Sequence, residues 1–138
     1  MSLTTRHALI IAGTLFWSVA AQAEDDCAKL SPDVEVYACG QQKKDNAEKA
    51  LNAEYAQAKE RIKRGMRDSQ TAIKEYTDLL IKAQRSWLSL RDYQCQMEVY
   101  GGDKNSNVYL DLTNDCITRM DNARTEMLKK VPYDALSD

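Results

Sequence analysis

Hydrophobic residues between positions 47 and 62 recur every three or four residues, the spacing that places side chains on one face of an α-helix. They are Ala47, Leu51, Tyr55, Ala58 and Ile62. Mainly lysine, glutamate, glutamine and arginine fill the positions between them. The segment therefore predicts an amphipathic helix of about 24 residues that ends near Gly65.

Two further runs show the same periodicity. The second contains Ile73, Tyr76, Leu80, Ala83, Trp87, Leu90 and Val99. Asp68 or Ser69 supplies the cap that precedes it, and we expect it to end at Gly101 and Gly102 because paired glycines stop helices. The third contains Tyr109, Leu112, Cys116, Met120, Ala123 and Met127. This last helix should stop before Pro132.

A further helix start precedes the first run. Ser31 offers a capping hydroxyl, Pro32 suits a first helical turn, and Asp33 lies near the positive end of the helix dipole. Gly40 is expected to loosen the helix that begins there. No segment alternates at period two for long enough to predict a strand. The predicted fold is all-α, an elongated antiparallel three-helix bundle with a short N-terminal helical extension.

Residues 1–23 have the three parts of a secretory signal peptide. Arg6 precedes the apolar stretch ALIIAGTLFWSVA, and the small residues of "AQA" follow it. We expect cleavage after Ala23, a mature domain at residues 24–138, and a periplasmic or secreted protein. The stretch is shorter than the roughly 20 apolar residues of a membrane helix, so we expect no membrane embedding. Three acidic residues precede Cys27, which argues against a lipid anchor there.

Removing this segment also removes the chain's single histidine, His7. The usual general base near neutral pH and the commonest zinc ligand are then missing, so we predict a protein that is not an enzyme. Carboxylate catalysis of the glycosidase type is a minor alternative, because a thin helical bundle rarely encloses a sugar cleft. The carboxylates concerned are Asp92, Glu98, Asp103, Asp111 and Asp115.

The net charge of the chain and the spacing of its acidic and amide residues also limit which ligands it could bind. Without Arg6, 18 of the 19 basic residues stand against 21 acidic ones, a formal charge of −3 that argues against nucleic acid. Asp103, Asn105 and Asn107 resemble the start of a calcium loop, but Val108 replaces the required glycine and Asn114 the required glutamate. We expect no metal and no other cofactor.

Four cysteines remain after the leader: Cys27, Cys39, Cys95 and Cys116. In an exported protein an even number predicts disulfides, here two. The loop at 101–107 lies midway between Cys95 and Cys116, so these should face each other across an antiparallel helix pair. Cys27 would then pair with Cys39. A Cys39–Cys95 pair is the alternative, because a hairpin centred near residue 68 also brings those positions close.

The stretch AQRSWLSLRDYQC at residues 83–95 places tryptophan, arginine and cysteine on one helical stripe. Such a mixture predicts an internal polar seam that fixes how the helices pack. Folding the first two helices about residue 68 puts Asp45 near Arg91, while the third helix adds Arg124. The predicted seam comprises Asp45, Asn52, Tyr55, Gln84, Arg85, Trp87, Arg91 and Arg124.

The order of Cys39, Asp45, LNAEY, AQRSWLSLRDYQC, the Gly-Gly pair, Cys116, Arg124 and Leu128 resembles the LprI-like lysozyme inhibitor family. The resemblance covers residues 27–128. One departure stands out, because Asp121 occupies the position where we expect a threonine. The resemblance implies a helical, disulfide-bonded periplasmic or surface protein and, for at least one branch of the family, an inhibitor of c-type lysozyme.

The connection after the second helix is the preferred site for such a partner. It consists of Gly101, Gly102, Asp103, Lys104 and Asn105. C-type lysozyme carries two carboxylates in its cleft, so an inhibitor gains by placing a cation there, and Lys104 is the candidate. A solvated connector is the simpler interpretation of the same residues. The alternative function is binding of another envelope or secreted protein through Tyr93, Tyr100 or Tyr109.

Overall fold

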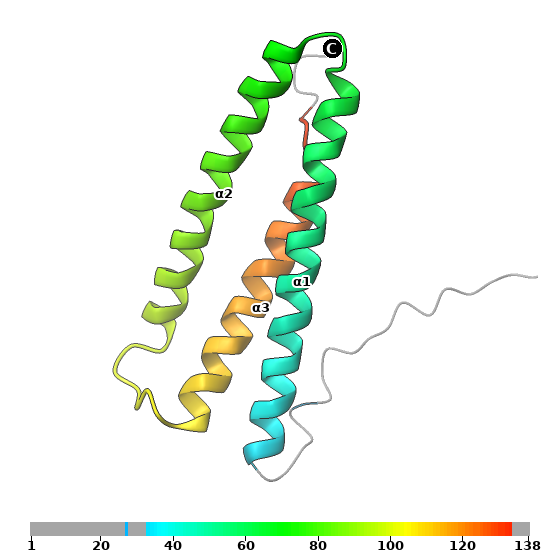
Figure 1. Ribbon diagram of the computed structural model, residues 1–138. Coiled ribbons are helices and arrows are strands. Elements are labelled where there is room, and N and C mark those ends of the chain that lie inside the picture. The colour runs from blue at the N-terminus through cyan, green and yellow to red at the C-terminus, as the bar shows by residue number, and fades with distance from the viewer. Residues whose placement is uncertain (1–26, 28–32, 134–138) are drawn as a thin grey trace, which may run out of the picture.

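Three helices make up the protein in the computed structural model, which describes Cys27 and residues 33–133. They are α1 (Asp33–Gly65), α2 (Gln70–Glu98) and α3 (Asn107–Lys129). The helices run antiparallel to their neighbours in sequence and form an elongated bundle (Figure 1). The expected all-helical fold is confirmed, whereas the proposed signal peptide lies outside the described residues.

Local sequence signals explain where the helices begin. The Ser69 hydroxyl accepts a hydrogen bond from the backbone N–H of Ala72 at 3.2 Å and caps α2. Ser106 does the same for α3, accepting from the N–H of Tyr109 at 3.1 Å. Each serine satisfies a backbone donor that the first turn leaves without an intrahelical partner. Each of the two connections between the helices therefore ends in a hydrogen-bonded serine cap.

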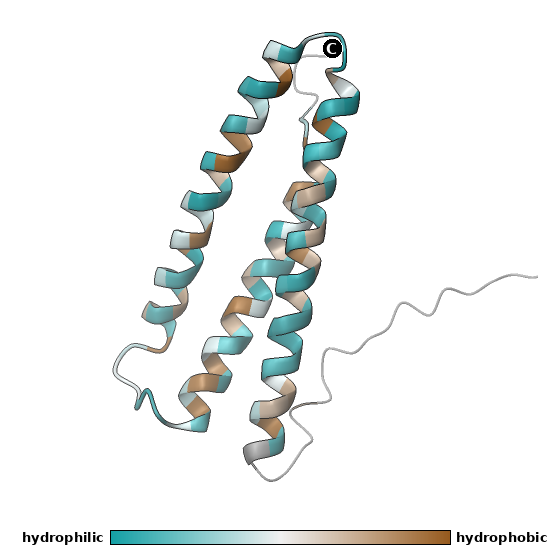
Figure 2. Cartoon of the chain, viewed as in Figure 1, coloured by the Kyte–Doolittle hydropathy of each residue, from teal (hydrophilic) through white to brown (hydrophobic). Residues whose placement is uncertain are grey.

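The helices do not pack equally. α1 lies most closely against α3, while α2 stands farther out and touches α1 over a short stretch (Figure 1). The largest buried hydrophobic cluster gathers near one end of the molecule and consists of Leu51, Ala58, Ile62, Leu80, Leu128 and Val131. Only Leu80 comes from α2. Most of the α1 ribbon is coloured hydrophilic in Figure 2, so hydrophobic residues make up a minor part of this helix.

Both disulfides have the favoured pairing. Cys27 is bonded to Cys39 and Cys95 to Cys116, each pair with Cα atoms 5.6 Å apart. The second bridge joins α2 to α3 near the loop that connects them, as the position of that loop between the two cysteines predicts. The alternative Cys39–Cys95 pair is therefore excluded.

The expected N-terminal extension is the first part of α1 itself. Gly40 lies inside one continuous helix, Asp33–Gly65, instead of interrupting it. Its lack of a side chain has a packing reason, because a Cβ atom built there would overlap the Asp111 carboxylate on α3. Glycine thus allows α1 and α3 to approach at this end. None of the helices in the described part of the chain is apolar enough over a sufficient length to cross a membrane.

Candidate functional site

An ion pair between α2 and α3 forms the centre of the polar seam. Arg91 Nη1 donates to Asp121 Oδ1 at 2.9 Å and lies 3.3 Å from Oδ2. The Asp121 side chain is completely buried, and that of Arg91 is 11% exposed. A charge-assisted contact with so little access to water is stronger than the same contact at a surface. The pair therefore fixes the two helices against each other.

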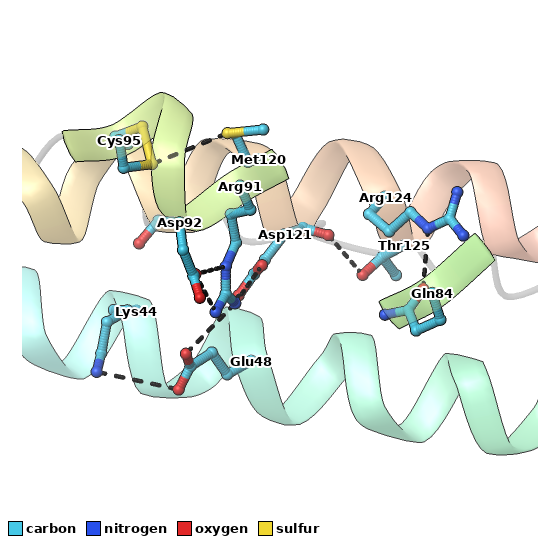
Figure 3. A network of polar contacts seen from close by, with 12 residues as sticks. Lys44, Glu48, Gln84, Arg91, Asp92, Cys95, Met120, Asp121, Arg124 and Thr125 are labelled. Atoms are coloured by element: carbon cyan, nitrogen blue, oxygen red, sulfur yellow. Dashed lines mark hydrogen bonds and ion pairs between the residues drawn. A yellow bond between two sulfur atoms is a disulfide. The ribbon is translucent and has the colours of Figure 1, made fainter. Parts of the chain in front are cut away.

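Two more carboxylates surround the same guanidinium (Figure 3). Asp92 on α2 accepts from Arg91 Nε at 3.0 Å and from Nη2 at 2.9 Å. Glu48 on α1 lies 3.5 Å from Nη1, and Lys44 lies 3.9 Å from the other Glu48 oxygen. Arg91 thus connects all three helices.

Burial and neighbouring charges shift the pKa values of both Asp121 and Arg91. Burial raises the pKa of Asp121 above its ordinary value, and the hydrogen bond from Arg91 offsets only part of the rise. The charges of Glu48 and Asp92 raise the Asp121 pKa further. Burial acts to lower the pKa of Arg91, but its hydrogen bonds to Asp121 and Asp92 outweigh this and raise it. The guanidinium therefore stays charged among three acids.

A second polar contact lies farther along the same two helices. Arg124 Nε on α3 donates to Gln84 Oε1 on α2 at 3.0 Å, and both residues are buried. The centre of the half-buried Trp87 ring lies 5.8 Å from the Arg91 guanidinium carbon and 5.7 Å from that of Arg124. These distances allow cation–π attraction to both arginines. Trp87 is thus a shared neighbour of the two arginines in the seam.

The structure brings together four of the predicted seam residues: Gln84, Trp87, Arg91 and Arg124. Asp45 is exposed, accepts a hydrogen bond from Gln41 at 2.9 Å and lies 3.4 Å from Lys44. Arg91 is paired with Asp121 in its place. Asn52 and Arg85 are also exposed.

The reason is the arrangement of the helices. The expected Asp45–Arg91 contact assumed that α1 lies against α2 along its length, but α1 packs mainly against α3. Tyr55, the remaining predicted seam residue, packs beside the hydrophobic cluster with Lys59 Nζ 4.7 Å from the centre of its ring.

Sequence reasoning missed the partners of Arg91 that matter most. Asp121 was visible in the sequence only as the residue that replaces an expected threonine. A buried acid opposite a buried arginine is a physical reason for that departure, because the two charges compensate each other. Asp92 follows Arg91 directly, and Glu48 follows Asp45 by three residues on the same helix.

A third arginine ties α1 to the end of α3. Arg61 Nη2 lies 2.8 Å from Glu54 Oε1 and donates to the carbonyl oxygen of Leu128 at 2.7 Å. Its Nε donates to the carbonyl oxygen of Val131 at 2.8 Å. The last carbonyl groups of a helix lack intrahelical partners and attract cations, so Arg61 serves as a cap supplied by another helix. These contacts are structural.

The loop between α2 and α3 is held by its own hydrogen bonds. Gly101 has φ = 85°, which favours glycine, and the Gly102 N–H donates to the Val99 carbonyl at 3.1 Å. The Asp103 carboxylate accepts from the Asn105 N–H at 3.0 Å, and its carbonyl accepts from the Ser106 hydroxyl at 2.8 Å. The loop therefore has a defined shape.

Lys104 projects from this loop into solvent. No ion pair to Lys104 is formed by any residue between 33 and 133. Together with Tyr100 and Tyr109 it borders a hollow of about 420 Å³. Tyr100 is 93% exposed. The loop thus presents a cation and an aromatic ring next to a concave surface.

The described residues contain no side-chain cluster of the kind that binds a metal ion. Within the described range, nowhere do three or more histidine, cysteine, aspartate or glutamate side chains gather as they would around a metal ion. The carboxylate oxygen that a calcium loop would offer, from Asp103, is engaged with the backbone of its own loop.

Comparison with known proteins identifies the family. The chain is 29% identical over 118 residues to an uncharacterised protein of Rhizobium meliloti (strain 1021), covering 81% of this chain and 82% of the relative. A crystal structure of a DUF1311 family protein from Pseudomonas putida KT2440 superposes with a TM-score of 0.62 at 26% identity, covering 71% of this chain and 91% of that one. The family model described as "Lysozyme inhibitor LprI" matches residues 24–128. The chain therefore belongs to the LprI family of lysozyme inhibitors.

Proposed function

We propose that this protein inhibits c-type lysozyme by placing the loop of residues 101–105 in the active-site cleft. Family membership supports a lysozyme as the partner. The observation that carries the proposal is the exposed Lys104, which projects from a hydrogen-bonded loop without an ion-pair partner in the described part of the chain. Its charge is available for an acidic partner.

The chemistry of the two surfaces is complementary. A retaining glycosidase of this kind uses two carboxyl groups on either side of the sugar, so its cleft attracts a cation. An ammonium group that donates to these carboxylates replaces the substrate and forms charge-assisted hydrogen bonds. Because the Asp103 and Ser106 bonds hold the loop before binding, little conformational entropy is lost on association.

The rest of the fold suits a role outside the cytoplasm. Both disulfides belong in an oxidising compartment, which is also where a lysozyme acts on the cell wall. We infer that the protein is exported through residues 1–23 and works in the periplasm or outside the cell. In this function it is a binding protein without catalytic residues, and it protects the wall by occupying the enzyme.

The loop is tested by Lys104→Ala. We expect inhibition of c-type lysozyme to weaken by about 10- to 100-fold, the range for losing charged hydrogen bonds, with unchanged helical circular dichroism. Lys49→Ala is the matched control, because it removes an exposed lysine from α1 and should leave inhibition unaltered. An unchanged inhibition constant for Lys104→Ala would place the contact elsewhere.

A second candidate function rests on an exposed face of α2. Leu90, Tyr93 and Met97 follow at steps of three and four, Tyr100 lies just after the helix, and each of the four is more than half exposed. Exposed apolar residues gathered in this way are typical of a protein-binding surface. Binding of another envelope or secreted protein would be favoured if purified protein leaves lysozyme active while Tyr93→Ser abolishes capture of that partner.

A further inference from the structure

Among the described residues, Arg124 has no acidic partner, unlike the two other inward-facing arginines. Arg91 is bonded to Asp121 and Asp92, and Arg61 lies against Glu54. Arg124 is only 9% exposed, yet within the described residues its single hydrogen bond is the one from Nε to the Gln84 amide oxygen. In Figure 3 no dashed line reaches the two terminal nitrogens of its guanidinium.

With this single hydrogen bond, the positive charge of the Arg124 guanidinium is incompletely compensated. A guanidinium keeps its proton under ordinary conditions and offers five N–H donors, of which Gln84 takes one. The Trp87 ring at 5.7 Å contributes attraction but no hydrogen-bond acceptor comparable to a carboxylate. Burial lowers the pKa of Arg124, as expected for a cation removed from water without a counter-ion.

Arg124 also lines a pocket of about 260 Å³. Most of the remaining lining is apolar and comes from Leu79, Leu80, Ala83 and Val131. The pocket lining comes from the first half of α2, from Arg124 and from the segment after α3, whereas the loop at residues 101–105 follows the other end of α2. It is therefore separate from the site proposed for lysozyme.

Two tyrosines of the lining are joined by a hydrogen bond. The backbone N–H of Tyr133 donates to the Tyr76 hydroxyl oxygen at 2.9 Å, which fixes the segment after α3 against α2. The site thus combines one buried cation, apolar side chains and a hydrogen-bonded tyrosine pair, features that small-molecule sites share.

We propose that this pocket binds a small monocarboxylate with a short apolar chain. The carboxylate accepts hydrogen bonds from the terminal nitrogens of Arg124, and the chain packs along Leu79, Leu80 and Val131. The paired geometry of a guanidinium and a carboxylate favours this anion. The pocket volume limits the chain to a few carbon atoms.

The test uses sodium hexanoate as the probe. Isotope-labelled full-length protein is titrated while NMR follows the Arg124 Nε–H signal and the methyl signals of Leu79 and Leu80. We expect saturable shifts at all three, with acetate and 1-hexanol binding about tenfold more weakly or worse because each lacks half of the recognised chemistry. Equal responses to 1-hexanol would overturn the proposal, since the arginine would then have no role.

Variants separate recognition from folding. Arg124→Gln should abolish the methyl shifts, whereas Arg119→Gln, which removes an exposed arginine from the same helix, should preserve them. Ala83→Phe fills the pocket without altering the Arg124–Gln84 bond and should weaken hexanoate by about tenfold or more. Unaltered binding to Ala83→Phe would contradict the proposal. So would binding that appears only after removal of residues 134–138, because the chain's own carboxylates would then hold the arginine.

Discussion

The three acids around Arg91 are not equivalent, because they differ in access to water. Asp92 and Glu48 are each more than one-third exposed, so either can be solvated if the arginine is lost. Asp121 is fully buried and cannot. Removing one partner of a buried pair leaves an uncompensated charge, whereas replacing both by hydrophobic residues is often tolerated. Among the three acids, the loss of Asp121 should therefore lower the free energy of unfolding most.

We expect Asp121→Ala to lower the free energy of unfolding by about 3 kcal/mol, since it creates a cavity and leaves Arg91 with only its more exposed partners. Urea denaturation measures the change. The exposed neighbour provides the control, and Asp92→Ala should cost less than about 1 kcal/mol. The double replacement Arg91→Met with Asp121→Leu should recover most of the loss. A cost for Asp121→Ala no larger than that for Asp92→Ala would show that burial adds nothing to this pair.

At the level of helices, the sequence predicts the features that depend on interactions between residues close in sequence. Hydrophobic periodicity predicted all three helices, and Ser69, one of the two expected caps, is the residue that caps α2. The Cys95–Cys116 bridge was also predictable, because a short loop fixes which positions of α2 and α3 face each other. These features depend on neighbours in sequence, and tertiary packing does not alter them.

Which helices lie together was not predictable in the same way. Gly40 appeared to be a weak point of a helix, but it is the place where α1 admits Asp111 of α3. That role depends on a residue 71 positions away, which no local pattern reveals. The α1–α3 contact could not be predicted from the sequence either. For that reason Asp45 was the expected partner of Arg91, and Asp121 was not.

The α1–α3 contact at Gly40 has a consequence for pH dependence. Burial raises the pKa of Asp111, and the charge of Asp115 raises it further, while Lys43 opposes both. A carboxyl whose pKa is raised on folding stabilises the protein below its unfolded pKa, about 3.9, and loses that contribution as the pH rises through the folded value. Asp111 lies beyond the first turn of α3, where the helix dipole has little effect.

We therefore expect Asp111→Asn to gain stability relative to the unsubstituted protein as the pH rises from about 4 to 7, because asparagine cannot ionise. Urea unfolding at the two pH values measures the difference. Asp45→Asn removes an exposed carboxylate from α1 and should show no comparable gain. A difference between Asp111→Asn and the unsubstituted protein that does not change with pH would contradict this assignment.

Across the whole molecule, α2 is the element held by the fewest contacts. Leu80 is its buried residue in the main hydrophobic cluster, Tyr76 and Trp87 pack against that cluster, and α2 touches α1 over a short stretch. Within the described residues, α2 is held by the hydrophobic cluster and the Tyr76–Tyr133 hydrogen bond near one end, by the polar seam along its length, and by the Arg119–Glu98 ion pair and the Cys95–Cys116 bridge near the other end. The last of these also anchors the loop that carries Lys104.

The two disulfides should consequently have similar effects on stability and different effects on inhibition. They close loops of similar length, with sequence separations of 12 and 21, so replacing either pair by alanine should lower the free energy of unfolding by about 3 kcal/mol. Only Cys95→Ala with Cys116→Ala removes the covalent link at the end of α2, and we expect it to weaken lysozyme inhibition because the loop must then be ordered on binding. Hydrogen exchange of the loop amides and inhibition constants of the two double variants measure both effects. Equal losses of inhibition would mean that the loop keeps its shape through the Asp103 and Ser106 hydrogen bonds alone.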